Sequence, residues 1–490
     1  MHPVLRSVLR RTGLVGLGLA CALAGLLQAG VLDHAAQLER KGRFREAETA
    51  LERALETARP GSTHRLRLEE ERERLRRIRL DYPLTRAALW TALEESLVDA
   101  SPTEFERWLA EGRFDSIQID GTRWYADTAI SNLFFRHPEL GARRRSPGRA
   151  AGKARLSWEN AVAIRDAARR EQRPYVLPKR LQVTMTLTVP ADTIPPGTTV
   201  RAWFPVPRRY GFQDRLTLLG TSSPLQALAD PDSPIRSAYV EHPAATNAET
   251  RIWIEYAYTA WGVHFDIDPA RVALPRPLDP DLDRHTRQET HVEFTSPLRT
   301  VARQIAGAER NPARLARRFY DWIADNIRYS YSPEYGTIRN LSDYCLSHRY
   351  GDCGQQAFLF IALCRLHGIP ARWQSGWSLF PGSESIHDWC EIHLPPYGWV
   401  PVDPYMGGFA TQYATDLDPA QRRELRDFYF GGLSQYRLAA NRDHNQPLTP
   451  PKRSLRSDPV DFQRGELEAA GRNLYFPEFR RRLVWKEIEP

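Results

Sequence analysis

A strict alternation of apolar and polar side chains between residues 181 and 189 constrains the fold more than any other feature of this chain. The stretch reads LQVTMTLTV, with an apolar residue at every odd-numbered position. A period of two is typical of a strand that buries one face. The pattern returns over residues 200–206 and 251–261, and Pro- and Gly-rich turns separate the three stretches. We therefore expect an antiparallel β domain over residues 176–272, in the form of a sandwich.

The preceding residues, 33–172, have helical spacing instead and are predicted to form a helical domain. Helices are expected over 33–41 and 45–57, and this pair resembles a single tetratricopeptide-like hairpin without a second copy. Alternating charges over 63–79 are typical of a solvated helix face. The order Ser-Pro-Thr-Glu at 101–104 predicts a helix that begins with a capping box and has Pro in its first turn.

After a Pro-rich linker the pattern becomes mixed. Pro312 predicts the start of one helix, and Asp352 and Gly368 bound a second, whose side chains are almost all apolar beyond its first turn. Three strands are expected to follow, over residues 371–379, 388–394 and 399–402. These elements predict a core domain over 297–410, and residues 411–490 are expected to pack back on it. The whole chain is thus predicted to be a multi-domain α+β protein.

The first 29 residues have the pattern of an export signal. Three arginines precede an apolar run over 13–27, and small residues follow at spacings that suit cleavage. The run can be extended to Leu32, which is long enough to span a bilayer, so an uncleaved anchor is the alternative. Either interpretation places the protein outside the cytoplasm, in the periplasm or tethered to the membrane and facing it.

The charge of the chain does not indicate a nucleic-acid partner. The net charge is +8 over 490 residues, and this modest surplus comes almost entirely from arginine. No helix-turn-helix, zinc-finger or RNA-binding pattern accompanies it. We expect no nucleic-acid partner, and the sequence does not indicate an oligomeric state.

Four of the five cysteines fall within residues 345–390. A disulfide scaffold would spread its cysteines more widely, so this clustering indicates one local site. A disulfide between Cys345 and Cys390, or one that involves Cys364, is compatible with a free thiol at Cys353.

Cys353 is expected in the first turn of the buried helix, where it becomes a candidate nucleophile. Unpaired backbone N–H groups and the helix dipole favour an anion there, which predicts a lowered thiol pKa. A thiolate nucleophile also needs a base and a group that orients the base. His387 lies on a predicted strand and Asp403 ends the next one. The PPYG turn between these strands brings Asp403 near His387, and the helix tip can then bring Cys353 to the other ring nitrogen.

Two stretches that contain these residues resemble the transglutaminase-like superfamily of papain-type cysteine enzymes. They are GDCGQQAFLFIALCRLHGIPARWQSGW and IHDWCEIHLPPYGWVPVDPY, and the resemblance extends over about residues 297–407. It implies a helix that carries the cysteine and packs on an antiparallel sheet. By position, Cys353 is then the nucleophile, His387 the general base and acid, and Asp403 the orienting residue.

The resemblance implies no cofactor. The acidic-loop calcium motif that regulates animal transglutaminases is absent from the sequence, so calcium dependence is not carried over. The backbone N–H of Cys353 is the one oxyanion donor that can be identified. Gln355 and Tyr344 are further candidates that no pattern favours.

A zinc site is the rival interpretation of the cysteines. Cys345 with His348, and Cys364 with His367, form two C-x-x-H pairs, which is formally enough for four-coordinate zinc. However, the second pair ends a buried helix, and a two-residue spacing arises easily by chance. We therefore expect no metal site.

These observations predict an exported cysteine enzyme that attacks a peptide bond or a Gln or Asn carboxamide through a Cys thioester. Water would complete a protease or amidase reaction, and an amine would complete an acyl transfer. A protein or peptide of the cell envelope is the expected substrate. The alternative is a catalytically silent transglutaminase-like module that binds or assembles envelope components.

Overall fold

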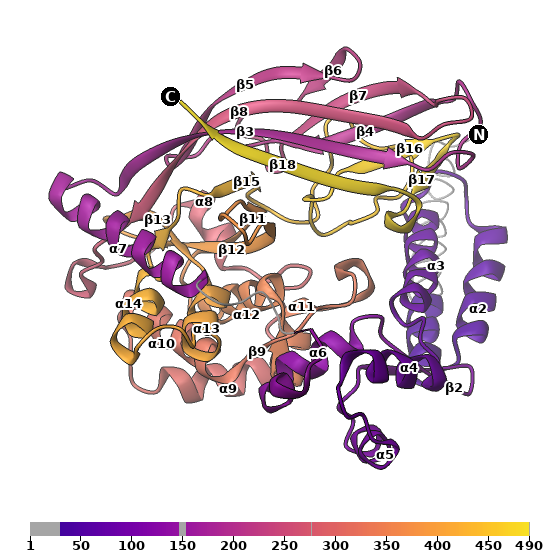
Figure 1. Cartoon of the computed structure of the whole chain (residues 1–490), viewed down its shortest axis with the longest axis horizontal. Helices are drawn as coiled ribbons and strands as arrows, with labels where there is room; N and C mark the ends of the chain where they lie inside the picture. The colour runs from indigo at the N-terminus through magenta and orange to yellow at the C-terminus, as the bar shows by residue number, and fades with distance from the viewer. Residues whose placement is uncertain (1–29, 147–152, 276, 490) are drawn as a thin grey trace, which may run out of the picture. The chain divides into compact units, whose positions relative to one another are not determined.

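The computed structural model describes residues 30–146, 153–275 and 277–489. The chain forms two compact units, Met1–Pro147 and Gly148–Pro490 (Figure 1). The predicted export signal or anchor, residues 1–29, lies outside the described residues. Within the described part of the chain, no helix combines the length and apolarity needed to cross a membrane.

The first unit is mainly helical. Residues 30–40 form a helix, and the following elements are α2 Phe44–Thr57, α3 Thr63–Asp81, α4 Arg86–Ser96, α5 Pro102–Ala110, β1 Ser116–Ile119, β2 Thr122–Tyr125, α6 Ala129–Arg136 and a 3₁₀ helix, η1 Pro138–Arg143. The helices predicted at 33–41, 45–57 and 63–79 are thus present. Ser101 precedes α5 as predicted but makes no capping bond with its side chain. The predicted capping box is therefore wrong, and Glu104 instead pairs with Arg143 at 2.7 Å.

The helix α7 (Lys153–Glu171) belongs to the second unit, whereas the predicted helical domain extended to residue 172. Its buried face, which includes Ala161 and Ile164, packs against Leu425 and Phe428. The apolar stripe of α7 is therefore covered by elements that come late in the chain, and the division falls before this helix.

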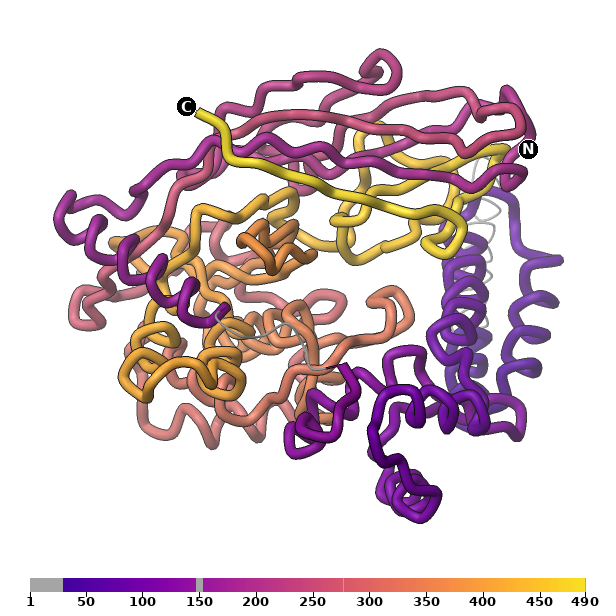
Figure 2. The backbone as a smooth tube through the Cα atoms, viewed as in Figure 1, coloured from indigo at the N-terminus to yellow at the C-terminus, as the bar shows by residue number. Residues whose placement is uncertain are grey.

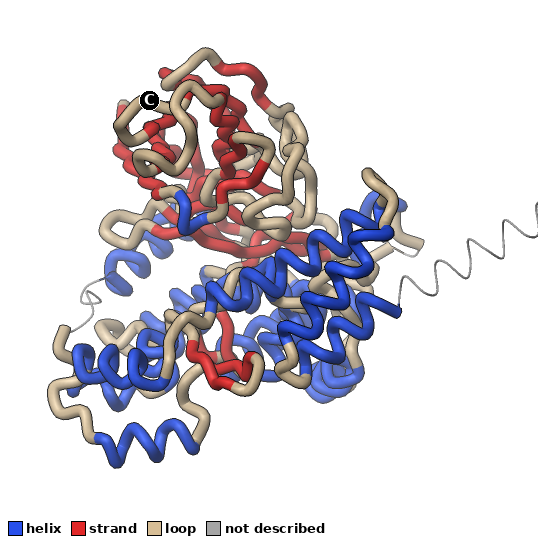
Figure 3. The backbone as a smooth tube through the Cα atoms, turned by 90° about the vertical axis from the view of Figure 1, so that its right-hand side faces the viewer, coloured by secondary structure: helices blue, strands red, loops and turns tan. Residues whose placement is uncertain are grey.

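Two antiparallel sheets form the β domain. Its strands are β3 Tyr175–Val189, β4 Thr199–Pro205, β5 Gln213–Thr221, β6 Leu225–Leu228, β7 Ser237–Pro243 and β8 Thr250–His264. One sheet has the order β14-β8-β3-β18 with β5 on β8, and the other the order β17-β16-β4-β7-β6. Four of these strands come from the C-terminal segment, namely β14 (Gly432–Leu433), β16 (Glu466–Ala469), β17 (Arg472–Leu474) and β18 (Arg480–Ile488). The odd-numbered residues of 181–189 are buried and share one core with residues of β4 and β8, so the period of two is confirmed. Figure 3 shows these strands in red.

The core domain places a buried helix on a four-stranded sheet. Its elements are α8 Pro280–Asp283, α9 Ser296–Ala306, α10 Pro312–Asn326, β9 Arg328–Tyr329, α11 Leu341–His348, β10 Tyr350–Gly351, α12 Cys353–Leu366, β11 Ala371–Ser378, β12 Ser385–Leu394, β13 Gly398–Val402, α13 Pro404–Gln412 and α14 Pro419–Phe428, with 3₁₀ helices η2 Pro269–Arg271, η3 Arg284–Thr286 and η4 Tyr335–Thr337. The sheet order is β13-β12-β11-β15, in which β15 is Arg437–Asn441. Side chains of α12 and of the sheet share one apolar core, and Figure 1 shows α12 beneath β11 and β12.

The C-terminal segment, predicted to pack on the core, divides its strands between the core and the β domain. Its elements are β14 Gly432–Leu433, β15 Arg437–Asn441, β16 Glu466–Ala469, β17 Arg472–Leu474, η5 Phe476–Glu478 and β18 Arg480–Ile488. β15 completes the core sheet beside β11, whereas β16 pairs with β4 and β18 with β3. In Figure 2 the yellow end of the tube runs beside β3 over the length of β18. The segment is thus part of both domains.

Candidate active site

Cys353 is the first residue of α12 and stands at the tip of a buried helix. The Asp352 side chain accepts from the Gln355 backbone N–H at 3.0 Å, and Gln355 Oε1 accepts from the Asp352 N–H at 3.2 Å. This capping box fixes the first turn. The residues from Gly354 to Arg365 are buried, whereas Cys353 remains half-buried. The helix therefore holds a partly accessible sulfur in a fixed position.

His387 and Asp403 meet as the sequence predicted. His387 Nε2 lies 2.7 Å from Asp403 Oδ2, and both side chains are buried. Residue 387 lies on β12, and Asp403 directly follows β13, which pairs antiparallel with β12. The other Asp403 oxygen, Oδ1, accepts from the Met406 backbone N–H at 3.1 Å and caps α13. One carboxylate therefore both orients the imidazole and caps a helix.

Arg437 is a third member of this buried group, and sequence reasoning did not identify it. Its Nη2 donates to Asp403 Oδ2 at 2.7 Å, and its guanidinium lies 4.9 Å from the centre of the Trp389 ring. The residue opens β15, in a segment that carries no recognisable motif. A lone arginine before the apolar residues Leu438, Ala439 and Ala440 was the one signal available.

The electrostatics of this group keep His387 neutral and Asp403 charged. Burial lowers the pKa of His387, and Arg437 lowers it further, against the opposing effect of Asp403. The pKa of Asp403 is lowered despite its burial, because His387 and Arg437 both stabilise the carboxylate. A neutral imidazole is the form that can accept a proton from a thiol.

The thiol itself lies in a different environment from the one predicted. Cys353 Sγ donates to Asp388 Oδ2 at 3.6 Å, and within the described residues no hydrogen bond joins it to His387. Burial raises the pKa of the Cys353 thiol, and the carboxyl groups of Asp388 and Asp352 raise it further. The predicted lowering of this pKa is therefore wrong, since desolvation and two carboxyl groups outweigh the helix terminus.

Tyrosines surround the thiol and the imidazole. The Tyr405 ring stands edge-on to His387 at 5.5 Å, and Tyr329 lies 5.0 Å from Tyr405. Charge on Cys353 contributes to raising the pKa values of Tyr329, Tyr335 and Tyr405, after burial as the main cause. The surroundings of the sulfur are thus aromatic and weakly hydrated.

The two further oxyanion candidates, Gln355 and Tyr344, make other contacts as well. Gln355 is fully buried and its amide oxygen takes part in the capping box. Tyr344 stacks on His348 with ring centres 4.1 Å apart. The Cys353 backbone N–H remains the donor identified from the sequence.

The cysteines do not converge on a metal site. Cys345, Cys353, Cys364 and Cys390 are all free thiols. In the described parts of the chain, one group of side chains has the spacing of metal ligands, namely Glu289, Asp443 and His444, and it contains no cysteine. The two C-x-x-H pairs therefore do not form the zinc site considered from the sequence. Glu289 already pairs with Arg365 at 2.5 Å.

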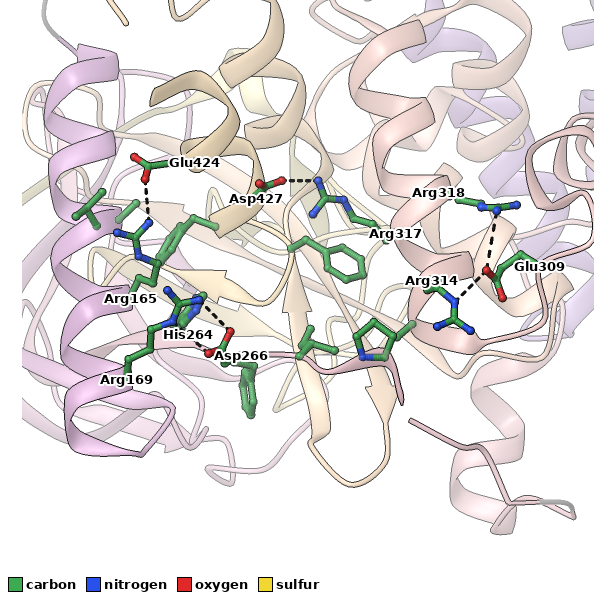
Figure 4. A pocket seen from close by; sticks show the side chains of 18 residues that line it. Arg165, Arg169, His264, Asp266, Glu309, Arg314, Arg317, Arg318, Glu424 and Asp427 are labelled. Atoms are coloured by element: carbon green, nitrogen blue, oxygen red, sulfur yellow. Dashed lines mark hydrogen bonds and ion pairs between the residues drawn. The ribbon is translucent and has the colours of Figure 1, made fainter. Parts of the chain in front are cut away.

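A cavity of about 540 Å³ lies apart from these residues, among α7, α10, α14 and the chain after β8 (Figure 4). Its charged lining residues are Arg165, Arg169, Arg314, Arg317, Arg318, Asp266, Glu309, Glu424 and Asp427. Each arginine is ion-paired, for example Arg169 with Asp266 at 3.0 Å, so the charges nearly balance. Phe430 also lines the cavity, and its backbone forms an antiparallel β-bridge with Val402, the residue before Asp403. The cavity thus adjoins the backbone that carries Asp403.

Comparison with known proteins finds a family match within the core domain. Residues 299–404 match the family described as the transglutaminase-like superfamily. "Uncharacterized protein YebA" of Bacillus subtilis (strain 168) is 26% identical over an alignment of 129 residues, and the match covers 22% of this chain and 17% of that protein. The match therefore spans less than a fifth of that relative's length.

Two solved structures are similar to parts of this chain. One, described as a "Putative Cysteine Protease" from Cytophaga hutchinsonii, is 16% identical with a TM-score of 0.42, over 64% of this chain and 93% of that one. The other is the periplasmic domain of TgpA from Pseudomonas aeruginosa, 17% identical with a TM-score of 0.27, over 47% of this chain and 91% of that one.

Proposed function

We propose that this chain, which carries a core of the transglutaminase-like superfamily, is a cysteine enzyme that forms a thioester on Cys353 from a peptide bond or a carboxamide. The observation that supports this most is the buried 2.7 Å contact between His387 Nε2 and Asp403 Oδ2. It commits Nε2 to the carboxylate and leaves Nδ1, which no described residue bonds, to exchange a proton with a thiol.

The reaction follows from these positions. The thiol proton moves to His387 Nδ1 as the sulfur attacks the carbonyl carbon of the substrate. His387 then returns that proton to the leaving nitrogen as the C–N bond breaks, and the acyl group stays on sulfur as a thioester. Attack by water releases an acid and completes hydrolysis, whereas attack by an amine forms a new amide. Asp403 and Arg437 hold the imidazole in place throughout.

The substrate and location are part of the same proposal. The arginines and apolar run in residues 1–29 support export, and an exported enzyme of this class meets proteins and peptides of the cell envelope. Fractionation of cells that express the full chain tests the location. Recovery of the protein in the cytoplasm alone contradicts it.

The decisive experiment compares the reaction products of the wild type with those of variants in the proposed site. Purified full-length protein is incubated with a glutamine-containing protein such as casein, with and without dansylcadaverine. Ammonia release, peptide fragments and dansyl incorporation are followed in parallel. The variants are C353A, H387A and H393A. His393 is a half-buried histidine on the same strand, packed on Trp399, and serves as the matched control. We expect activity in the wild type and H393A and its loss in C353A and H387A.

A catalytically silent binding module is the second candidate function. The observation that favours it is the thiol's hydrogen bond to Asp388 instead of His387. Absence of all three products from the wild type, together with alkylation of Cys353 no faster than that of a free thiol, would favour the silent module over the enzyme.

A further inference from the structure

Asp388 touches the sulfur of Cys353 and has no part in the reaction described above. We propose that Asp388 holds the Cys353 thiol in a protonated resting state, so that the nucleophile becomes reactive only when it leaves this carboxyl for His387. The proposal concerns regulation of the same site and rests on the proposed function for its consequence in turnover. The resting state itself can be measured without turnover.

The two acceptors of the thiol proton lie on opposite faces of one strand. Residues 387 and 388 are neighbours on β12, so their side chains point in opposite directions. His387 stacks with Trp389 on one face. Asp388, on the other face, lies 3.6 Å from the sulfur at the tip of α12. In the structure the thiol bonds to Asp388, and in the proposed mechanism a bond to His387 replaces this contact.

The Asp388 carboxyl is fixed on both of its oxygens. Oδ2 accepts from the Tyr335 hydroxyl at 3.0 Å, and Oδ1 accepts from Gln463 Nε2 at 2.5 Å. The same Gln463 nitrogen donates to the His387 carbonyl at 3.1 Å, which uses both of its hydrogens. Gln463 thus holds the backbone of His387 and the side chain of Asp388 in place through hydrogen bonds.

Gly354 shows that the chain makes room for this contact. A Cβ at that position would overlap the Tyr335 hydroxyl and lie 2.7 Å from Asp388 Oδ2. Its backbone φ is not in the left-handed region, so the glycine is needed for space and not for conformation. A side chain directly after the nucleophile would push Tyr335 and Asp388 away from the sulfur.

The groups around Asp388 are mainly acidic. Those that face it are Cys353 and Asp352 at the start of α12, Tyr335 of η4, and Asp461 in the loop before β16. The Tyr335 hydroxyl also lies 2.8 Å from Asp352 Oδ1, so its single hydrogen can donate to only one of the two carboxyls at a time. Burial raises the pKa of Asp461 to about 7, against the opposing effect of Arg456.

Buried carboxyls crowded in this way resist ionisation, because each lost proton leaves a further negative charge in the group. Burial raises the pKa of Asp388, and Asp461 and Asp352 raise it further. A thiolate beside them would add another negative charge to the group. The protonated thiol of Cys353 is therefore favoured.

The test measures ionisation of the thiol through its alkylation. Full-length wild type, D388N and D461N react with iodoacetamide between pH 5 and pH 10, and mass spectrometry reports the modification at Cys353. The other three cysteines that the structure describes are buried and serve as internal references. Once ionised, Asp388 adds a negative charge beside the sulfur, whereas the amide introduced by D388N stays neutral. We therefore expect the half-point of the D388N profile to fall by about one pH unit, a roughly tenfold faster reaction at pH 7. D461N removes a neighbouring carboxyl that does not touch the sulfur and should change the rate less than threefold.

A second variant keeps the proposal testable if D388N does not fold. Y335F removes a hydrogen-bond donor from Asp388 Oδ2, which makes this oxygen a stronger acceptor for the thiol. Alkylation should then slow by at least threefold at pH 7. Superimposed profiles for the wild type and D388N, an equal shift in D461N, or an unchanged rate in Y335F would each overturn the proposal. If the alkylation profiles shift as expected but neither the wild type nor any variant turns over substrate, the proposed resting state is supported and the proposed enzyme activity is contradicted.

Discussion

Arg437 and His387 contact the same oxygen of Asp403, each at 2.7 Å, although they come from β15 and β12, the two strands that flank β11 in the core sheet. One carboxylate oxygen therefore accepts hydrogen bonds from both a neutral imidazole and a permanently charged guanidinium. The position of the imidazole depends on a residue from the C-terminal segment as much as on the hairpin that carries it.

Replacement of Arg437 by Gln should impair both activity and stability. Arg437 lowers the pKa of His387, so its loss raises that pKa and leaves more of the imidazole protonated. The acid limb of the kcat/KM profile should move to higher pH. Removal of one partner from a buried charge pair costs about 3–5 kcal/mol of unfolding free energy. R437K, which keeps the charge, should shift the acid limb less. An unshifted limb in R437Q contradicts the assigned role.

Replacement of Asp403 by Asn should uncouple the imidazole from its orienting group. The loss in kcat is expected to be on the order of 10²–10⁴-fold, since an amide does not stabilise the imidazolium that forms. Activity within threefold of the wild type would show that His387 does not need this partner.

The same substitution predicts a change in acid stability. His387 and Arg437 hold the pKa of Asp403 below its unfolded value, which is about 3.9. Asp403 therefore contributes stability that is fully present above about pH 4 and is lost as the pH falls through its folded pKa. Urea denaturation of the wild type should show this decline at low pH. In D403N the decline should be shallower, because the titrating group is gone.

Replacement of Gly354 by Ala should destabilise the core. The added methyl group overlaps Tyr335 and Asp388, and overpacking of this kind costs about 1–3 kcal/mol. G408A is the matched control, because a Cβ on Gly408 in α13 meets its nearest atom at 3.8 Å. Thermal denaturation should show a lower Tm for G354A and a Tm within about 2 °C of the wild type for G408A, as is usual for nearly neutral substitutions. Equal melting points for both variants would refute the packing argument.

Replacement of Gln463 by Leu should remove the fastening between the C-terminal segment and β12. It leaves the His387 carbonyl and Asp388 Oδ1 without this donor, at a cost of about 1–3 kcal/mol for each buried acceptor. Urea denaturation measures that cost. Gln226 in β6 is exposed, and Q226L is the control that should change stability by less than about 0.5 kcal/mol.

The local part of the site was predictable, and the distant part was not. The PPYG turn fixes the register of β12 against β13, so the meeting of His387 and Asp403 follows from a short stretch of sequence. Arg437 reaches Asp403 because β15 pairs with β11, and no local pattern signals a pairing across so many residues. The same limit applies to β18, whose pairing with β3 gave the C-terminal segment a place in the β domain.

The thiol was predicted in the right place with the wrong pKa. Helix position is a property of nearby sequence, and the start of α12 at Cys353 was confirmed. Desolvation and the approach of Asp388 depend on tertiary packing, which the pattern around Cys353 does not encode. The predicted effect of the helix dipole was therefore outweighed by groups that only the fold brings together.

Gln463, which fastens both acceptors of the thiol proton, is made 110 residues after Cys353. A chain that emerges from the ribosome therefore exposes the cysteine before the residue that positions Asp388 and the His387 backbone has been synthesised. The contacts of the proposed site therefore form only after residue 463 has been made, so a product that terminates before it carries Cys353 without the residue that positions Asp388.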